Sequence, residues 1–122
     1  MQSLFHKPTQ DSPEIILDAQ NGVFRIAGTS FSDNPFDVYD PVITWFNDYL
    51  KTPNKETVLE LKMNYVNTAS SKQISDIVAL LVRHKDKNIK VRWFYDKQDE
   101  DMQYEGETLS MTHEIDFELI PY

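Results

Sequence analysis

A chain of 122 residues is long enough for one domain around one hydrophobic core. Its formal net charge is −8 and its pI is about 4.7, so it lacks the basic stripe with which proteins bind nucleic acids or anionic membranes. The absence of cysteine excludes disulfides, thiolate zinc sites and cysteine nucleophiles. The N-terminus lacks the apolar core of a signal peptide and no segment has the roughly 20 apolar residues of a membrane span, so we expect a cytoplasmic protein.

The first part of the chain predicts a flexible lead-in followed by a β-hairpin. Residues 1–12 have little apolar pattern, and we expect a single domain over residues 13–122. Short apolar runs at 14–18 and 23–29 flank Asn21-Gly22, a dipeptide that is typical of hairpin turns. These two runs are therefore the first two expected strands.

A helix and a strand follow the hairpin. The helix is expected to begin with Asp40 as its cap and Pro41 as its first residue, and to end before Pro53-Asn54. Residues 57–66 alternate between apolar and polar side chains, which predicts a strand with one buried face. The side chains expected on the buried face are Leu59, Leu61, Met63 and Tyr65.

The second half of the chain repeats this order. An apolar stripe predicts a helix that opens near Asn67 and ends at Asn88. Alternation predicts a strand at 89–95, and the acidic segment 96–107 is expected to be partly helical up to about residue 112. A final strand is expected at 115–120.

Strands with one apolar and one charged face predict helices on only one side of the sheet, because a sheet covered on both faces would show continuous apolar runs. Helical connections between strands imply parallel neighbours joined by right-handed crossovers. The expected fold is a two-layer α/β sandwich with a mixed sheet of about five strands.

Most candidates for catalytic or metal chemistry have a simpler interpretation. The histidines share no metal-ligand spacing and are interpreted as surface residues, and the three glycines stand too far apart to form a phosphate-binding loop. The acidic cluster does not match a calcium loop and indicates a solvated face. The aromatic residues indicate core packing. The histidines are His6, His84 and His113. The acidic cluster consists of Asp96, Asp99, Glu100, Asp101, Glu105 and Glu107. The aromatic residues are Trp45, Trp93, Phe94 and Tyr95.

One segment, Asn67-Thr68-Ala69-Ser70-Ser71-Lys72, combines the features of a helix start and of a modification site. Helix caps favour Ser, Thr, Asp or Asn, so the segment can be interpreted simply as a cap. A cap needs only one such residue, however, and this segment holds four. A hydroxyl at a helix start also suits phosphorylation, because unpaired N–H groups and the positive dipole end tolerate a phosphate there.

The segment and two other motifs resemble a known family. A strand, a hydroxyl-rich turn and a helix in a small two-layer domain resemble the STAS and anti-sigma-factor-antagonist fold. More closely, the chain resembles the SiaC family of bacterial regulatory phosphoproteins. Tyr65-Val-Asn-Thr-Ala-Ser-Ser-Lys72 is similar to the family's Tyr-x-Asn-Thr-Ser-Ser-x-Lys. The stretch from Gly28 to Trp45 is similar to its Gly-x-Ser-Tyr-Pro-Glu-Asn pattern and the helix that follows, and Arg92-Trp93-x-Tyr95-Asp96 is a weaker third match.

The sequence departs from the family pattern in two places. Phe31-Ser32-Asp33 replaces Tyr-Pro-Glu in the first motif, so the roles of those family side chains do not carry over. Ala69 replaces a common Ser, which removes one alternative phosphoacceptor.

The resemblance implies a partner-switching protein that is not an enzyme and needs no cofactor or metal. It implies that Thr68 is phosphorylated by a dedicated GHKL-type kinase and dephosphorylated by a PPM-type phosphatase. In the best-known member the unphosphorylated form binds and activates a diguanylate cyclase, so we expect an output protein of that kind. The expected partner-binding residues are Asn67, Thr68, Ser70, Ser71 and Lys72, and whether Ser70 or Ser71 shares the modification stays open.

Three other functions remain as alternatives. A small-molecule site could use the aromatic residues Trp93, Phe94 and Tyr95. A scaffold subunit could use the polar sheet face or the acidic segment 96–107. A hydrolase could hold a metal among Asp96, Asp99 and Asp101.

Overall fold

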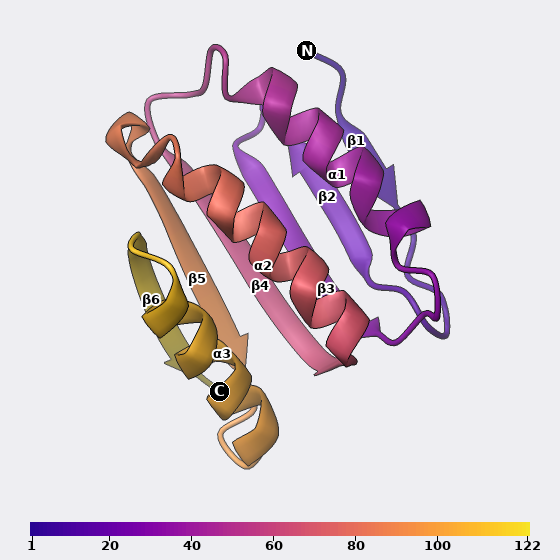
Figure 1. Cartoon of the computed structure of the whole chain (residues 1–122). Coiled ribbons are helices and arrows are strands. Elements are labelled where there is room, and N and C mark those ends of the chain that lie inside the picture. The colour runs from indigo at the N-terminus through magenta and orange to yellow at the C-terminus, as the bar shows by residue number, and fades with distance from the viewer.

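A computed structural model describes residues 1–122 as two layers, a six-stranded sheet and three helices that lie on one of its faces (Figure 1). The strands are β1 (Leu4–His6), β2 (Glu14–Asp18), β3 (Val23–Ser30), β4 (Thr57–Val66), β5 (Ile89–Tyr95) and β6 (Asp116–Pro121). The helices are α1 (Phe36–Tyr49), α2 (Thr68–Val82) and α3 (Glu100–Thr112), with a short 3₁₀ turn, η1, at Lys85–Lys87. None of these helices is long and apolar enough to cross a membrane.

The strands lie in the sheet in the same order as in the sequence, from β1 to β6. The pairs β1–β2 and β2–β3 are antiparallel, whereas β3–β4, β4–β5 and β5–β6 are parallel. Each parallel pair is joined through one helix. Each of these crossovers leads to the next strand on the same side of the previous one. Because crossovers of this kind share one hand, α1, α2 and α3 all lie on the same face of the sheet. The prediction of a mixed sheet with helices on one face is confirmed.

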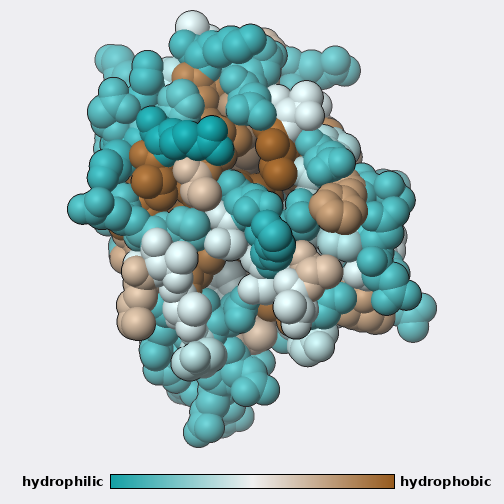
Figure 2. All heavy atoms as spheres, viewed as in Figure 1, coloured by the Kyte–Doolittle hydropathy of each residue, from teal (hydrophilic) through white to brown (hydrophobic).

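Alternating burial along the strands decides which side chains form the core. In β5, Ile89, Val91, Trp93 and Tyr95 are buried under the helices, while Lys90, Arg92 and Phe94 face the other way. The open face of the sheet carries ion pairs between neighbouring strands, at Arg25–Glu60, Lys90–Asp116, Lys90–Glu118 and Arg92–Glu118. On the helix face, polar atoms cover most of the surface and apolar atoms are visible mainly in its upper half (Figure 2).

The expectation of a flexible segment before residue 13 is wrong for residues 4–6. These residues pair with Ile15–Leu17 and form the edge strand β1, which raises the number of strands from about five to six. Leu4 packs against the core, and the indole N–H of Trp45 donates a hydrogen bond of 2.8 Å to the carbonyl of Gln2. Contacts from elsewhere in the chain therefore order this segment.

The limits of the first two helices differ from the prediction. Helix α1 begins at Phe36, so Pro41 lies inside the helix and Asp40 is not its cap. The earlier start buries Tyr39 completely, which stabilises the extra turn. Helix α2 ends at Val82, and η1 then leads to Asn88, which has a left-handed backbone (φ 59°) immediately before β5.

Candidate functional site

The hydroxyl-rich segment lies at the carboxyl end of β4, where the first turn of α2 begins (Figure 1). Asn67 is the N-cap: its backbone is extended, and its side-chain oxygen accepts a hydrogen bond of 2.8 Å from the backbone N–H of Ser70. This is the usual way in which an Asn satisfies a free N–H at a helix start. The carboxyl ends of the parallel strands β3, β4 and β5 share this edge of the sheet, an edge at which open α/β sheets commonly bind ligands.

Asn67 also joins the two sequence motifs. Its backbone N–H donates to the carbonyl of Ser30 at 2.9 Å, and its side-chain amide donates to the carbonyl of Ser32 at 3.3 Å. The loop after β3 is thereby fixed beside the start of α2. Residues more than thirty positions apart in the sequence form one surface.

The hydroxyls of the segment differ in their surroundings. Thr68 is exposed at the first helical position, and its hydroxyl has no hydrogen-bond partner in the chain. Ser70 is completely buried and accepts a hydrogen bond of 2.7 Å from the hydroxyl of Ser30. Ser71 is half-buried and donates to the carboxylate of Glu105 in α3. The expectation that Ser70 contacts a partner directly therefore does not fit the structure, because a partner cannot reach a hydroxyl that is under the helix.

Ser70 instead belongs to a buried chain of hydroxyls. The hydroxyl of Tyr39 donates to Ser30 at 2.8 Å, and Ser30 in turn donates to Ser70. Burial raises the pKa of Tyr39 to about 12, although its hydrogen bond to Ser30 acts in the opposite direction. These three hydroxyls connect α1, β3 and α2 directly beneath the exposed segment.

Lys72 is the only basic residue of the segment, and it points to solvent. Its ammonium group lies 3.4 Å from the carboxylate of Asp76, one turn further along α2. Side chains of both residues are largely accessible, at 74% and 47%. Lys72 is therefore accessible to a partner.

Two exposed aromatic side chains border the site and were not singled out from the sequence. Phe31 and Tyr65 contact each other edge to face, with ring centroids 6.4 Å apart, and are 41% and 50% exposed. The prediction that Tyr65 faces the core is wrong. The pairing of β3 and β4 shifts between Gly28 and Thr29, and this irregularity breaks the alternation just before Tyr65. Phe31 lies in a turn-rich stretch without periodicity, so the sequence pattern did not predict its exposure.

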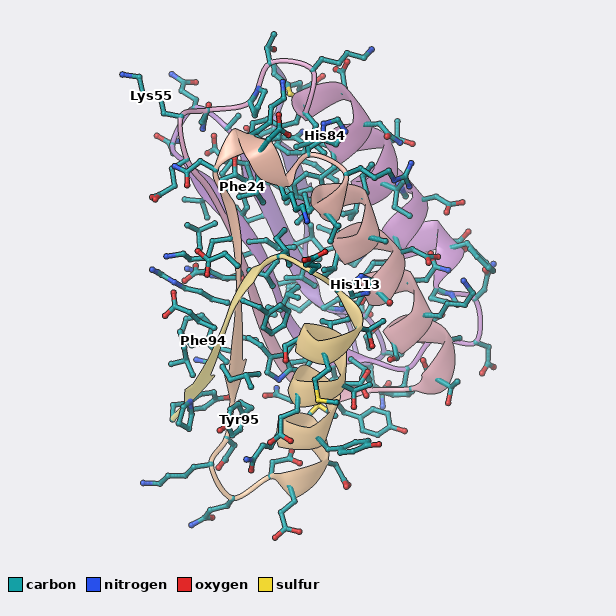
Figure 3. All side chains as sticks on the ribbon, turned by 60° about the vertical axis from the view of Figure 1, so that its left-hand side comes forward. Phe24, Lys55, His84, Phe94, Tyr95 and His113 are labelled. Carbon is teal, nitrogen blue, oxygen red and sulfur yellow. The ribbon has the colours of Figure 1, made fainter.

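The aromatic residues of β5 do not form a ligand pocket. Trp93 and Tyr95 are buried in the core, while Phe94 lies on the opposite face of the sheet (Figure 3). The indole N–H of Trp93 donates to the carbonyl of Met102 at 2.9 Å, and Gly106 in α3 packs directly on the indole ring. Trp93 therefore attaches α3 to the sheet.

The acidic residues have structural positions at the start of α3. Asp99 is its N-cap and accepts a hydrogen bond of 3.0 Å from the backbone N–H of Met102, while Glu100 and Asp101 lie in its first turn. No three His, Asp or Glu side chains of the structure are arranged as a metal site requires. Carboxylates at a helix N-terminus stabilise it through the helix dipole.

His113 is more than a surface residue. It ends α3 half-buried, and its Nε2 lies 2.8 Å from the hydroxyl of Ser75 in α2. Desolvation lowers the pKa of His113, and the negative charge of Asp76 opposes that shift. No local sequence pattern predicts this contact, because its two residues are 38 positions apart.

Comparison with known proteins agrees with this architecture. Over 82% of its length the chain is 31% identical to an uncharacterized protein of Pseudomonas aeruginosa strain UCBPP-PA14, covering 81% of that protein. Its structure resembles SiaC of Pseudomonas aeruginosa with a TM-score of 0.90 and 27% identity, covering all of both chains. It matches equally well, with a TM-score of 0.91, 27% identity and coverage of 98% and 99%, a crystal structure of the diguanylate cyclase SiaD in complex with its activator SiaC. Residues 6–122 match the SiaC family, and the chain therefore belongs to this family of regulatory phosphoproteins.

Proposed function

We propose that this protein is a partner switch, controlled by reversible phosphorylation of Thr68, that binds an output protein when Thr68 is unphosphorylated. Membership of a family of regulatory phosphoproteins supports a modified residue rather than a catalytic one. The observation that carries the proposal is the accessibility of one hydroxyl. Thr68 is exposed and unbonded, whereas Ser70 is buried and Ser71 is bonded to Glu105.

The surroundings of Thr68 fit both states. Its place at the start of α2 lets the fold tolerate a phosphate, because the helix dipole favours negative charge there. The exposed pair of Phe31 and Tyr65 at the same edge of the sheet provides apolar surface for a partner. A dianion within that surface would have to be desolvated on binding, which can cost several kcal/mol.

The partners follow from the family and its relatives. The relative SiaC is described as the activator of the diguanylate cyclase SiaD, so a diguanylate cyclase is the output protein that we propose for this chain. In this proposal a GHKL-type kinase adds the phosphate and a PPM-type phosphatase removes it. Asn67, Ser71 and Lys72 are the remaining proposed contacts, and Ser70 supports them from beneath.

The experiment uses calorimetric titration to measure how tightly four forms of the protein bind the diguanylate cyclase of the same bacterium. We expect Thr68→Ala to bind like the unphosphorylated protein, and protein phosphorylated on Thr68 to bind at least tenfold more weakly, a difference of about 1.4 kcal/mol or more. Thr68→Asp, with only one negative charge, should lie between them.

Thr44→Asp is the matched control, because it adds the same charge at an exposed threonine of α1. It should leave the affinity unchanged. Equal affinities of the phosphorylated and unphosphorylated forms would refute the switch. Mass spectrometry that finds no phosphate on Thr68 in native cells, under any growth condition, would argue that Thr68 only begins the helix.

A further inference from the structure

We propose that, when Thr68 is phosphorylated, Lys72 leaves its ion pair with Asp76 and pairs with the phosphate on Thr68 instead. This change of partner transmits phosphorylation along α2 to its contact with α3. The inference rests on the proposed function, because it requires a phosphate on Thr68. It assigns to Lys72 a role within the protein, as the residue that changes partner between the two states.

The positions of Thr68, Lys72 and Asp76 on α2 make this change of partner possible. Thr68, Lys72 and Asp76 stand four positions apart, so they lie on one face of the helix as successive neighbours. In the unphosphorylated structure the ammonium group of Lys72 lies 3.4 Å from one carboxylate oxygen of Asp76 and 3.5 Å from the other. The same ammonium group can instead point towards Thr68, which lies four residues, about one helical turn, before Lys72.

Helix geometry favours the phosphate over Asp76. Side chains on a helix lean towards its N-terminus, so an anion that precedes a lysine by four residues forms a better pair than one that follows it. Asp76 follows Lys72 and is therefore the poorer position, while Thr68 precedes it. The phosphate also carries about −1.5 to −2 charges at pH 7, compared with −1 for the carboxylate. Both the geometry and the charge direct Lys72 to the phosphate.

When Lys72 leaves Asp76, the electrostatic environment of His113 changes at the contact between α2 and α3. Asp76 already acts on His113, whose pKa its negative charge raises against the effect of desolvation. His113 ends α3 and faces α2, where it contacts Ser75 (Figure 3). The other charged groups around His113 are Lys85 and Glu114, which pair at 3.4 Å, and Asp116, which pairs with Lys90 at 3.9 Å; neither pair involves α2 or Thr68. When Lys72 leaves, the carboxylate of Asp76 is no longer neutralised, so the positive form of His113 becomes more favourable.

The test uses full-length protein with phosphothreonine incorporated at position 68 during synthesis, so it needs neither kinase nor partner. Phosphorus NMR measures the second pKa of the phosphate, and proton–carbon NMR measures the pKa of His113. We expect Lys72→Gln to raise the phosphate pKa by about 0.3 units, which is the size expected for one helical ion pair. Lys51→Gln, which removes the same charge from a pair with Asp48 at the far end of α1, should leave it unchanged.

The second readout follows the relay. Phosphorylation should raise the pKa of His113 by about 0.3 units in the protein with Lys72, and by less than half of that in Lys72→Gln. An equal phosphate pKa in Lys72→Gln and Lys51→Gln would overturn the exchange. An equally large shift of His113 without Lys72 would overturn the relay. Neither result depends on partner binding, so a failure of the switch and a failure of this inference are distinguishable.

Discussion

Replacement of Ser30 by alanine tests whether the buried hydroxyls hold the start of α2 onto the sheet. The hydroxyl of Ser30 accepts from Tyr39 at 2.8 Å and donates to Ser70 at 2.7 Å. All three residues are at most 2% exposed, so water cannot replace a lost partner. Ser30→Ala therefore leaves a donor and an acceptor without partners inside the protein.

The magnitude follows from the number of groups left unpaired. Each buried polar group without a hydrogen bond costs about 1–3 kcal/mol, so we expect Ser30→Ala to lower the free energy of unfolding by about 3 kcal/mol. Tyr39→Phe removes the donor itself and leaves only one acceptor of Ser30 unused, so it should cost about 1 kcal/mol. A loss of 3 kcal/mol is a large part of the roughly 5–15 kcal/mol that stabilises a typical domain.

Urea unfolding followed by tryptophan fluorescence measures both losses, and the slope with denaturant should stay unchanged. Ser110→Ala is the control, because that hydroxyl bonds only to the carbonyl of Glu107 in its own helix. It should change stability by no more than about 0.5 kcal/mol. If Ser30→Ala costs no more than Tyr39→Phe, the hydroxyl chain does not hold α2 as we describe.

Two further perturbations test the packing of α3 and the burial of Tyr39. A Cβ added at Gly106 would lie 2.6 Å from the indole nitrogen of Trp93, so Gly106→Ala should lower stability by about 1–2 kcal/mol despite its better helix propensity. A thermal midpoint equal to that of the wild type would contradict the close approach of α3 to β5. The second perturbation is alkaline pH: because the pKa of Tyr39 is about 12 in the folded protein and near 10 in the unfolded chain, stability should be full below pH 10 and decrease from pH 10 to 12. Unfolding titrations of Tyr39→Phe should lack this part of the decrease, and an unchanged decrease would contradict the assignment to Tyr39.

Periodicity in the sequence was sufficient to predict most of the sheet. Strands β4 and β5 have the predicted limits because alternation over residues 57–64 of β4 and over all of β5 specifies one buried face. Strand β1 could not be predicted in this way, because three residues carry too little pattern and the segment is ordered by contacts to Ile16 and Trp45. The early start of α1 was hidden by Pro41, which suggested a first helical position although it lies inside the helix.

The candidate site was predicted in part. The motif located Thr68 at a helix start, which the structure confirms, but it did not separate the hydroxyls from one another. A signal for Ser70 was nevertheless present, since Ser70 precedes Ile74 by four residues and continues the buried stripe of α2. The contacts of Glu105 and His113 with α2 join residues 34 and 38 positions apart, and no local pattern encodes them.

The order of the strands has a consequence for synthesis of the chain. From β2 onward, every strand pairs with the one that the ribosome makes immediately before it, so no later strand has to insert between two others. Pairing between consecutive strands alone limits the time for which a strand edge stays unpaired and exposed. A nascent chain that has emerged as far as Val82 already contains the cap of α2 and all three buried hydroxyls. Only Glu105 and His113, which close the site from the side of α3, arrive afterwards.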